Sequence, residues 1–214
     1  MFKIKRFTCN MLAENCYVVS DETNEAVIID CGALYEEEGA AIVDYIKSNG
    51  LTPKRLLCTH GHFDHCLGNG VIYHEFGLKP EVHQEDEFLM LKMREQTREI
   101  LGLSLPMEVP PVGRYLKDNE IITFGNHTFT LLHTPGHTPG GAVFYCEEEK
   151  AAFSGDTLFR MSIGRTDFER GSYEQMIDSL HNVMKQLPSD TVVYPGHGPE
   201  TTIADEVRYN PYLR

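Results

Sequence analysis

Six consecutive residues, HGHFDH at His60–His65, constrain this chain more than any other stretch of its sequence. They place three imidazoles and one carboxylate just after a short run, Arg55–Cys58, that predicts a buried strand. A glycine in the loop after a strand lets the chain curl, so that several side chains can converge on one point. Imidazole suits zinc and neighbouring transition metals, and an added carboxylate is typical of catalytic sites. We therefore expect a metal centre here, the alternative being a surface segment that scavenges metal.

Three more predicted strands end in the same way, each with a glycine beside one residue of ligand type. The motifs are TPGHT at Thr134–Thr138, SGD at Ser154–Asp156 and PGHG at Pro195–Gly198. A single histidine or aspartate in a turn usually forms hydrogen bonds within its loop. Four strand ends of one type in one domain are hard to attribute to turn chemistry, so we expect them to meet at one site.

Taken in order, these motifs resemble those of the metallo-β-lactamase-fold hydrolases, and they are most similar to the glyoxalase II group, the hydroxyacylglutathione hydrolases. Asp30, two residues before Gly32, matches the early structural aspartate of that family. The resemblance covers almost the whole chain and is specific for the fold and the metal site. It implies an α/β (α+β) fold, a four-layer αββα sandwich with the metals at one edge.

The resemblance also implies two divalent metal ions. The ligands of the first would be His60, His62 and His137, those of the second Asp64, His65 and His197, and Asp156 would bridge them. Asp30 and Thr138 would orient ligands through hydrogen bonds. Zinc is the first expectation, and iron or manganese also suits five histidines with two carboxylates.

The implied reaction is hydrolysis of a hydroxyacyl thioester by a hydroxide that bridges the two metals. Two cations can lower the pKa of a bound water from ~15.7 towards ~7. One metal would stabilise the developing oxyanion. Asp64 and Asp156 are the expected catalytic carboxylates, and the scheme needs no serine or cysteine nucleophile.

A loop after the bridging aspartate carries the expected substrate contacts. In glyoxalase II the matching loop has a basic and an aromatic residue that contact glutathione, and Arg165 and Phe168 are the corresponding residues here. The alternative for Arg165 is a solvated surface charge. Residues 102–113, interrupted by three prolines and two glycines, are expected to be irregular. They would either cover the substrate or form a packed connection.

The chain departs from glyoxalase II at its end, because it stops 17 residues after His197. We expect one domain over residues 1–214 without the C-terminal helical domain that binds glutathione, so another thiol carrier is open. Within the fold, the alternatives are a mononuclear iron persulfide dioxygenase, a lactonase or another hydrolase. An iron held by two histidines and one aspartate would leave Asp64, His65 and His197 without a purpose.

The composition of the chain limits the classes of partner that it is expected to bind. The chain has 19 Lys and Arg against 32 Asp and Glu, a net charge of −13, whereas nucleic-acid binding needs a basic surface. No apolar run approaches the ~18 residues of a membrane span. The six cysteines show no paired CxxC spacing. Cysteines without such spacing are typical of reduced thiols. We expect a cytoplasmic protein that acts on a small-molecule thioester, without nucleic-acid or membrane partners; its oligomeric state stays open.

The hydrophobic pattern predicts strands and helices in both halves of the chain. Strands are expected at Phe2–Thr8, Asn15–Ser20, Ala26–Ile29, Arg55–Cys58, Glu120–Phe124, His127–His133, Ala142–Cys146, Ala151–Ser154 and Thr191–Tyr194. Helices are expected at Glu36–Ser48, Cys66–Phe76, Glu85–Leu101 and Tyr173–Gln186, with a short one after Thr201. The other histidines are interpreted as structural or surface residues: His74, His83, His127, His133 and His181.

Overall fold

The central strands are buried on both faces, and this determines how the molecule is layered. Side chains of successive strand residues point to opposite faces. In β3 (Glu25–Ile29), Val27 and Ile29 pack into one hydrophobic core and Ile28 into another. A sheet with apolar residues on both faces needs a layer on each side, which here is a second sheet and a pair of helices.

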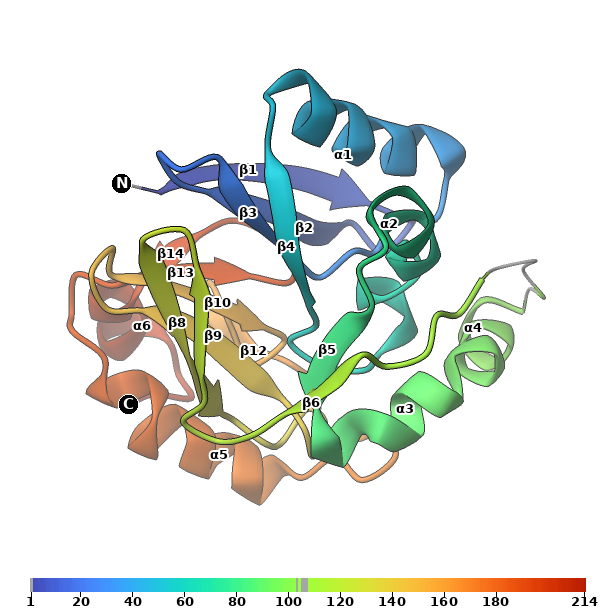
Figure 1. Cartoon of the computed structure of the whole chain (residues 1–214). Helices are drawn as coiled ribbons and strands as arrows, with labels where there is room; N and C mark the ends of the chain where they lie inside the picture. Colours follow the sequence, from blue (N-terminus) through green and yellow to red (C-terminus); the bar gives the residue numbers. More distant parts are fainter. Residues whose placement is uncertain (1, 103, 105–107) are drawn as a thin grey trace.

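The computed structural model, which describes residues 2–102, 104 and 108–214, is a four-layer αββα sandwich (Figure 1). The expected fold class is therefore confirmed. The first sheet has the strand order β1 (Lys3–Cys9), β2 (Glu14–Ser20), β3, β4 (Thr52–Leu57), β5 (Pro80–His83) and β6 (Arg114–Leu116). The second has the order β14 (Thr201–Thr202), β13 (Val192–Pro195), β10 (Ala151–Gly155), β9 (Ala142–Cys146), β8 (His127–His133) and β7 (Ile121–Phe124). A small hairpin joins β11 (Leu158–Phe159) to β12 (Ser162–Ile163).

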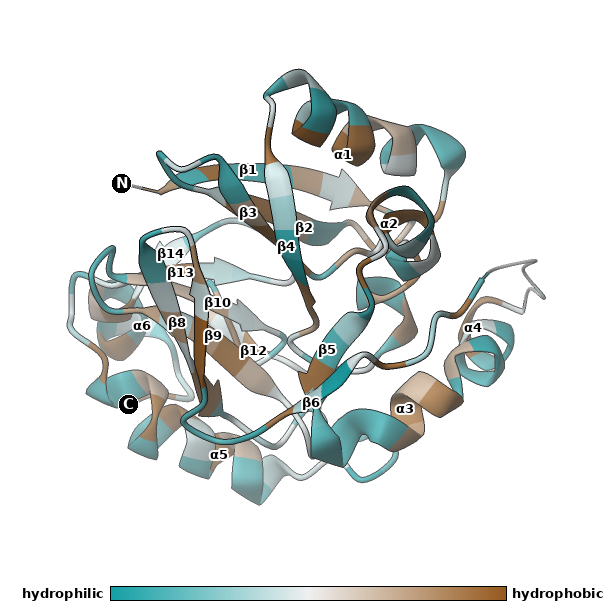
Figure 2. Ribbon diagram, viewed as in Figure 1, coloured by the Kyte–Doolittle hydropathy of each residue, from teal (hydrophilic) through white to brown (hydrophobic). Residues whose placement is uncertain are grey.

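Helices cover the outer face of each sheet. The first sheet is covered by α1 (Glu36–Ser48) and α2 (Asn69–Phe76), the second by α5 (Tyr173–Asn182) and α6 (Ile203–Tyr209) (Figure 1). Ile42 and Ile46 of α1 pack on Leu56, while Met176 and Leu180 of α5 pack on Val143 and Val193 in the second sheet. The inward faces of these helices are the hydrophobic ones in Figure 2. Each fully buried side chain of this kind stabilises the fold by roughly 1.5–3 kcal/mol.

Three predicted helices are wrong in extent. The one expected from Cys66 begins only at Asn69, because Gly68 lies against Cys31 and donates a backbone hydrogen bond to its carbonyl. The stretch from Glu85 is divided into a 3₁₀ turn at Gln84–Asp86, α3 (Glu87–Leu91) and α4 (Met93–Leu101). The helix expected to reach Gln186 ends at Asn182, and a 3₁₀ turn follows at Met184–Gln186.

Five strands were not predicted: β5, β6, β11, β12 and β14. They are two to four residues long, and β5 and β6 carry charged side chains. Segments this short do not show a hydrophobic pattern that predicts a strand. Glu81 of β5 is nevertheless buried, because Arg55 on β4 neutralises it at 3.0 Å. Short strands of this kind are specified by their neighbours and not by their own sequence.

Residues 102–113 were expected to be irregular. Residues 108–113 have no regular structure, as expected. Residues 103 and 105–107 lie outside the described residues, so the hypothesis of a substrate-covering loop stays a hypothesis. Within the described part of the chain, no helix has both the length and the apolar character needed to cross a bilayer.

Candidate metal centre

The predicted ligand residues come together at one edge of the two sheets. His60 and His62 follow β4, and a 3₁₀ turn at Phe63–His65 carries the next two ligand residues. His137, Asp156 and His197 follow β8, β10 and β13. Because β10 and β13 are parallel, their carboxyl ends meet at the same edge of the second sheet.

Two groups of ligand atoms form within this cluster. His60, His62 and His137 offer three imidazole nitrogens that all lie within 4.8 Å of one another, and Asp64, His65 and His197 form a second such group. Asp156 lies between them: its Oδ2 is 3.4 Å from His137 Nε2, and its Oδ1 is 3.3 Å from His65 Nε2. The clusters suit a dinuclear metal site with Asp156 in contact with both halves.

The hydrogen bonds on the outer side of the imidazoles fix which nitrogen faces inward. His137 Nδ1 donates to the carbonyl of Arg165 at 2.6 Å, and His197 Nδ1 donates to that of Leu12 at 3.1 Å. His65 Nδ1 donates to Asp30 at 3.0 Å. In a neutral imidazole the other nitrogen, Nε2, then carries a bare lone pair. Metal-binding histidines are oriented in this way.

Several inward atoms have no hydrogen-bond partner although they are buried. These are His60 Nε2, His65 Nε2 and Asp156 Oδ1. Buried polar atoms without a partner are costly and rare in native proteins. A metal ion at the centre of each group would satisfy all three, so the donor set fits a pair of metal ions.

The electrostatics differ between the two groups. Burial, together with repulsion from the neighbouring imidazoles, lowers the pKa of His60 well below its usual range and that of His62 to about 3. Both rings are therefore neutral, as metal ligation requires. Around His65, burial alone would lower the pKa, but the carboxylates of Asp156 and Asp64 outweigh it and raise the pKa well above its usual range. The second group thus concentrates negative charge that favours a cation.

Glycines beside the ligands are required by close approach. A Cβ on Gly196 would lie 2.6 Å from Asp156 Oδ1 and 2.6 Å from His65 Cε1. A Cβ on Gly164 would lie 1.9 Å from the carbonyl oxygen of Asp156. Neither position can carry a side chain without displacing the ligand residues.

Asp30 lies on the outer side of the ligand cluster and links two of its histidines, His60 and His65. Its Oδ1 accepts the backbone N–H of Thr59 and its Oδ2 accepts the Thr59 hydroxyl, both at 2.7 Å. The same Oδ2 accepts from His65 Nδ1. The Thr59 hydroxyl in turn accepts from His60 Nδ1 at 3.1 Å, so that one buried carboxylate orients an imidazole in each group.

Asp30→Asn is expected to lower the affinity for metal about 10- to 100-fold, because an amide cannot accept every hydrogen bond that the carboxylate accepts. Competition with a chelator measures this affinity. The matched control is Asp21→Asn, which removes another buried carboxylate bonded to a histidine, His127, at 3.0 Å and at the far end of β2. That variant should lose stability and keep its metal affinity; equal metal affinity in wild type and Asp30→Asn would contradict the role of Asp30.

Asp86 is a residue of the site that the sequence pattern did not reveal. Its Oδ2 accepts the backbone N–H of Gly61 and the hydroxyl of Thr138, both at 2.8 Å, and its Oδ1 accepts the backbone N–H of Gly140 at 2.6 Å. Thr138 was expected to orient a ligand, and it is this buried carboxylate that its hydroxyl contacts. Asp86 therefore ties the His60–His65 loop to the loop that carries His137.

Arg165 and Phe168 lie over the first histidine group. The Phe168 ring centroid is 4.9 Å from that of His62 and 5.7 Å from that of His137. The Arg165 guanidinium stacks on Phe168 at 4.3 Å and forms two hydrogen bonds with Asp167 at 2.8 Å. Its side chain is 63% exposed, so it is accessible to a ligand that approaches the histidines.

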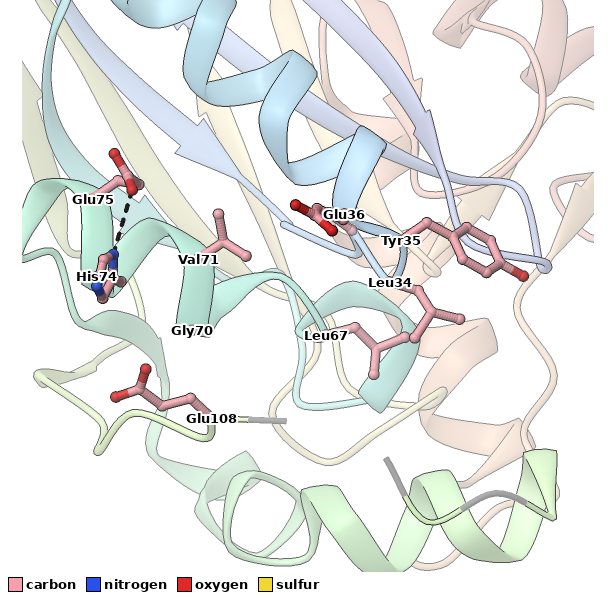
Figure 3. A pocket seen from close by; sticks show the side chains of 10 residues that line it. Leu34, Tyr35, Glu36, Leu67, Gly70, Val71, His74, Glu75 and Glu108 are labelled. Carbon is pink, nitrogen blue, oxygen red and sulfur yellow. Dashed lines mark hydrogen bonds and ion pairs between the residues drawn. The ribbon is translucent and has the colours of Figure 1, made fainter. Parts of the chain in front are cut away.

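A cleft of about 480 Å³ lies beside α1 and α2 (Figure 3). Leu34, Leu67 and Val71 form its apolar part, and Glu36 and Glu108 add carboxylates. It contains no residue of the two ligand groups. Because its charge is negative, it does not suit an acidic thioester, and we do not assign that substrate to it.

The other candidate ligands of the sequence are accounted for. All six cysteines are buried free thiols, and in the described residues none belongs to a group that could hold a metal. Cys66 Sγ points to Cys58 Sγ at 3.8 Å and to the carbonyl of His60 at 3.7 Å, away from the imidazole nitrogens.

Residues 10–197 match the family described as the metallo-beta-lactamase superfamily. The chain is 37% identical over 201 residues to the hydroxyacylglutathione hydrolase GloC of Haemophilus influenzae, covering 94% of this chain and 92% of that protein. Among solved structures, the BLEG-1 B3 metallo-beta-lactamase superposes with a TM-score of 0.90 at 34% identity, covering 100% of this chain and 99% of that one. TTHA1623 in a di-iron-bound form gives a TM-score of 0.85 at 36% identity, covering 98% and 100%.

Proposed function

This chain belongs to the metallo-beta-lactamase superfamily, and from that premise we propose that it is a dinuclear metal-dependent thioesterase of the glyoxalase II type. The observation that carries the proposal is the convergence of two ligand groups on Asp156, together with three buried inward atoms that have no hydrogen-bond partner, His60 Nε2, His65 Nε2 and Asp156 Oδ1. The similarity to a hydroxyacylglutathione hydrolase along 94% of the chain supports the choice of thioester as substrate.

The candidate ligand residues and their hydrogen-bond partners would have distinct roles. His60, His62 and His137 would hold one metal, Asp64, His65 and His197 the other, and Asp156 would contact both. When bound, such a pair supplies Lewis acidity and a water whose pKa is lowered from ~15.7 towards ~7. Asp30, Thr59 and the carbonyls of Arg165 and Leu12 keep the imidazoles in one tautomer. This preorganisation means that the ligands need not rearrange during the reaction.

The carrier part of the substrate would lie along the Arg165–Phe168 loop. Phe168 lies edge to face with His62 and His137 and covers one side of the first histidine group. A carboxylate on the thiol carrier would replace Asp167 as the partner of Arg165, since a guanidinium binds carboxylates in bidentate geometry. In a protein with a net charge of −13, an exposed arginine beside the ligand groups provides a local attraction for an anionic substrate.

We predict that Arg165→Ala raises KM for S-lactoylglutathione more than it lowers kcat. The arginine would contribute binding shared by ground state and transition state, about 1–3 kcal/mol for a charged hydrogen bond, or roughly 5- to 150-fold in KM. Its backbone carbonyl, which orients His137, is retained in the variant. Arg170→Ala, which removes a neighbouring arginine stacked on Phe88, is the control. An unchanged KM in Arg165→Ala would show that Arg165 is a solvated surface charge that does not bind the substrate.

A β-lactam ring is a second candidate substrate, because the chain superposes on a B3 metallo-beta-lactamase with a TM-score of 0.90. Steady-state assays of one protein sample with S-lactoylglutathione and with a chromogenic cephalosporin separate the two. The thioesterase proposal predicts a kcat/KM for the thioester at least ~100-fold above that for the cephalosporin, a difference of ~2.7 kcal/mol in transition-state binding. A higher kcat/KM for the cephalosporin than for the thioester would contradict the thioesterase proposal and support a β-lactamase.

A further inference from the structure

A second cluster of ligand-type side chains lies outside the site described above. It consists of His83 at the end of β5, Asp118 in the turn between β6 and β7, and His133 at the end of β8. Their ligand atoms all lie within 4.8 Å of one another. β5 belongs to the first sheet and β8 to the second, so the cluster joins the two sheets near their β6 and β7 edges.

The three side chains are held close together. His83 Nε2 is 2.8 Å from Asp118 Oδ1, and His133 Nδ1 is 3.4 Å from Asp118 Oδ2. The two imidazole rings are stacked, with centroids 4.2 Å apart and an interplanar angle of 16°. The histidines are fixed by their surroundings, with side-chain exposures of 7% for His83 and 23% for His133, whereas Asp118 is 55% exposed and free to adjust.

The contact between His133 and Asp118 depends on what lies between the two side chains. His133 Nε2 lies 2.8 Å from the carbonyl oxygen of Pro139, and because a carbonyl only accepts, this nitrogen carries the proton. In the neutral ring His133 Nδ1 is then a bare lone pair, and it faces a carboxylate oxygen that is also an acceptor. Two acceptors facing each other repel unless a cation lies between them, and that cation is either a proton on His133 Nδ1 or a metal ion.

We propose that His83, Asp118 and His133 form a third metal site, which takes a transition-metal ion such as Zn²⁺. Two imidazoles and one carboxylate are the ligands that this metal accepts in proteins. On binding, the proton of His83 Nε2 moves to Nδ1, which gives up the long hydrogen bond, 3.4 Å, that it accepts from the Glu85 N–H. The Asp118 and His133 side chains also line a cleft of about 410 Å³, from which water completes the coordination.

The third site has a consequence for stability that is separate from hydrolysis. A metal held by β5, β8 and the β6–β7 turn links the two sheets at their edges. Since it binds only the folded chain, its free energy of binding adds to the free energy of unfolding. The site therefore predicts a rise in Tm with added Zn²⁺ beyond that given by the two metals of the hydrolytic centre.

The test starts from enzyme that already carries its two metals and titrates it with Zn²⁺ by calorimetry, followed by dialysis and elemental analysis. Wild type should bind one further equivalent, with a rise in Tm. Asp118→Asn should lose both the equivalent and the rise. Its rate of S-lactoylglutathione hydrolysis should equal that of wild type. His133→Ala should behave in the same way, and Asp118→Asn keeps the test valid if that variant fails to fold.

The control is His74→Ala, which removes an exposed histidine that also lies beside a carboxylate, Glu75, at 3.3 Å. It should retain the further equivalent. No further equivalent in wild type, or the same uptake in Asp118→Asn, would overturn the third site and leave a hydrogen-bonded cluster. Either result would leave the thioesterase proposal standing, because that proposal depends on the other two metals.

Discussion

Asp156→Asn is expected to lower kcat/KM for S-lactoylglutathione by at least ~10³-fold, or about 4 kcal/mol of transition-state stabilisation. The carboxylate lies between the two ligand groups on their inner side, at 3.4 Å from His137 and 3.3 Å from His65. An amide of the same shape removes its negative charge and places an NH₂ group opposite a metal or an imidazole. The variant should therefore bind fewer than two metals per chain.

The fold should survive this substitution, because Asp156 Oδ1 has no hydrogen-bond partner within the protein that an amide would break. Far-UV circular dichroism and Tm test this, and Asp178→Asn on the exposed face of α5 is the control that should keep full activity. A folded Asp156→Asn enzyme with more than a tenth of wild-type turnover would contradict the bridging role. His62→Ala is expected to abolish turnover for the same reason, since it removes a ligand of the first group.

Asp86→Asn is expected to lower the free energy of unfolding more than Asp156→Asn does. The carboxylate is fully buried and accepts three hydrogen bonds, and an amide has only one oxygen to accept them. At least one backbone N–H then faces an NH₂ group without a partner, at a cost of about 2 kcal/mol. For a chain of this size the loss corresponds to a fall in Tm of roughly 4–8 °C.

Thermal unfolding followed by circular dichroism gives the shift, and Asp44→Asn on the exposed face of α1 should leave Tm within the error of the measurement. Turnover should also fall, because Gly61 and Gly140 lie in the two loops that position His60, His62 and His137. A Tm equal to that of wild type would show that Asp86 does not hold these loops together.

The convergence of the candidate ligand residues could be predicted because its signal is local. Each of the four motifs follows an apolar strand and contains a glycine, and Gly196 shows why, since a side chain there would meet both Asp156 and His65. The layers were expected from the family resemblance, and strands such as β3, which are apolar on both faces, agree with them.

Asp86 could not be predicted, because its function depends on contacts that are distant in sequence. It lies in a stretch that has helical periodicity, and its partners Gly61 and Thr138 are 25 and 52 residues away. His83 and His133 were interpreted as structural or surface residues for the same reason. Neither has a glycine turn beside it, and only the packing of the two sheets brings both to Asp118.

The measurement that tests the central claim most directly is the metal content of the purified protein, determined on the same sample as its S-lactoylglutathione hydrolysis. We predict at least two ions of zinc, iron or manganese per chain, together with thioester turnover that a chelator removes and two equivalents of metal restore. One iron per chain without thioester turnover, combined with oxygen consumption in the presence of a persulfide, would contradict the account.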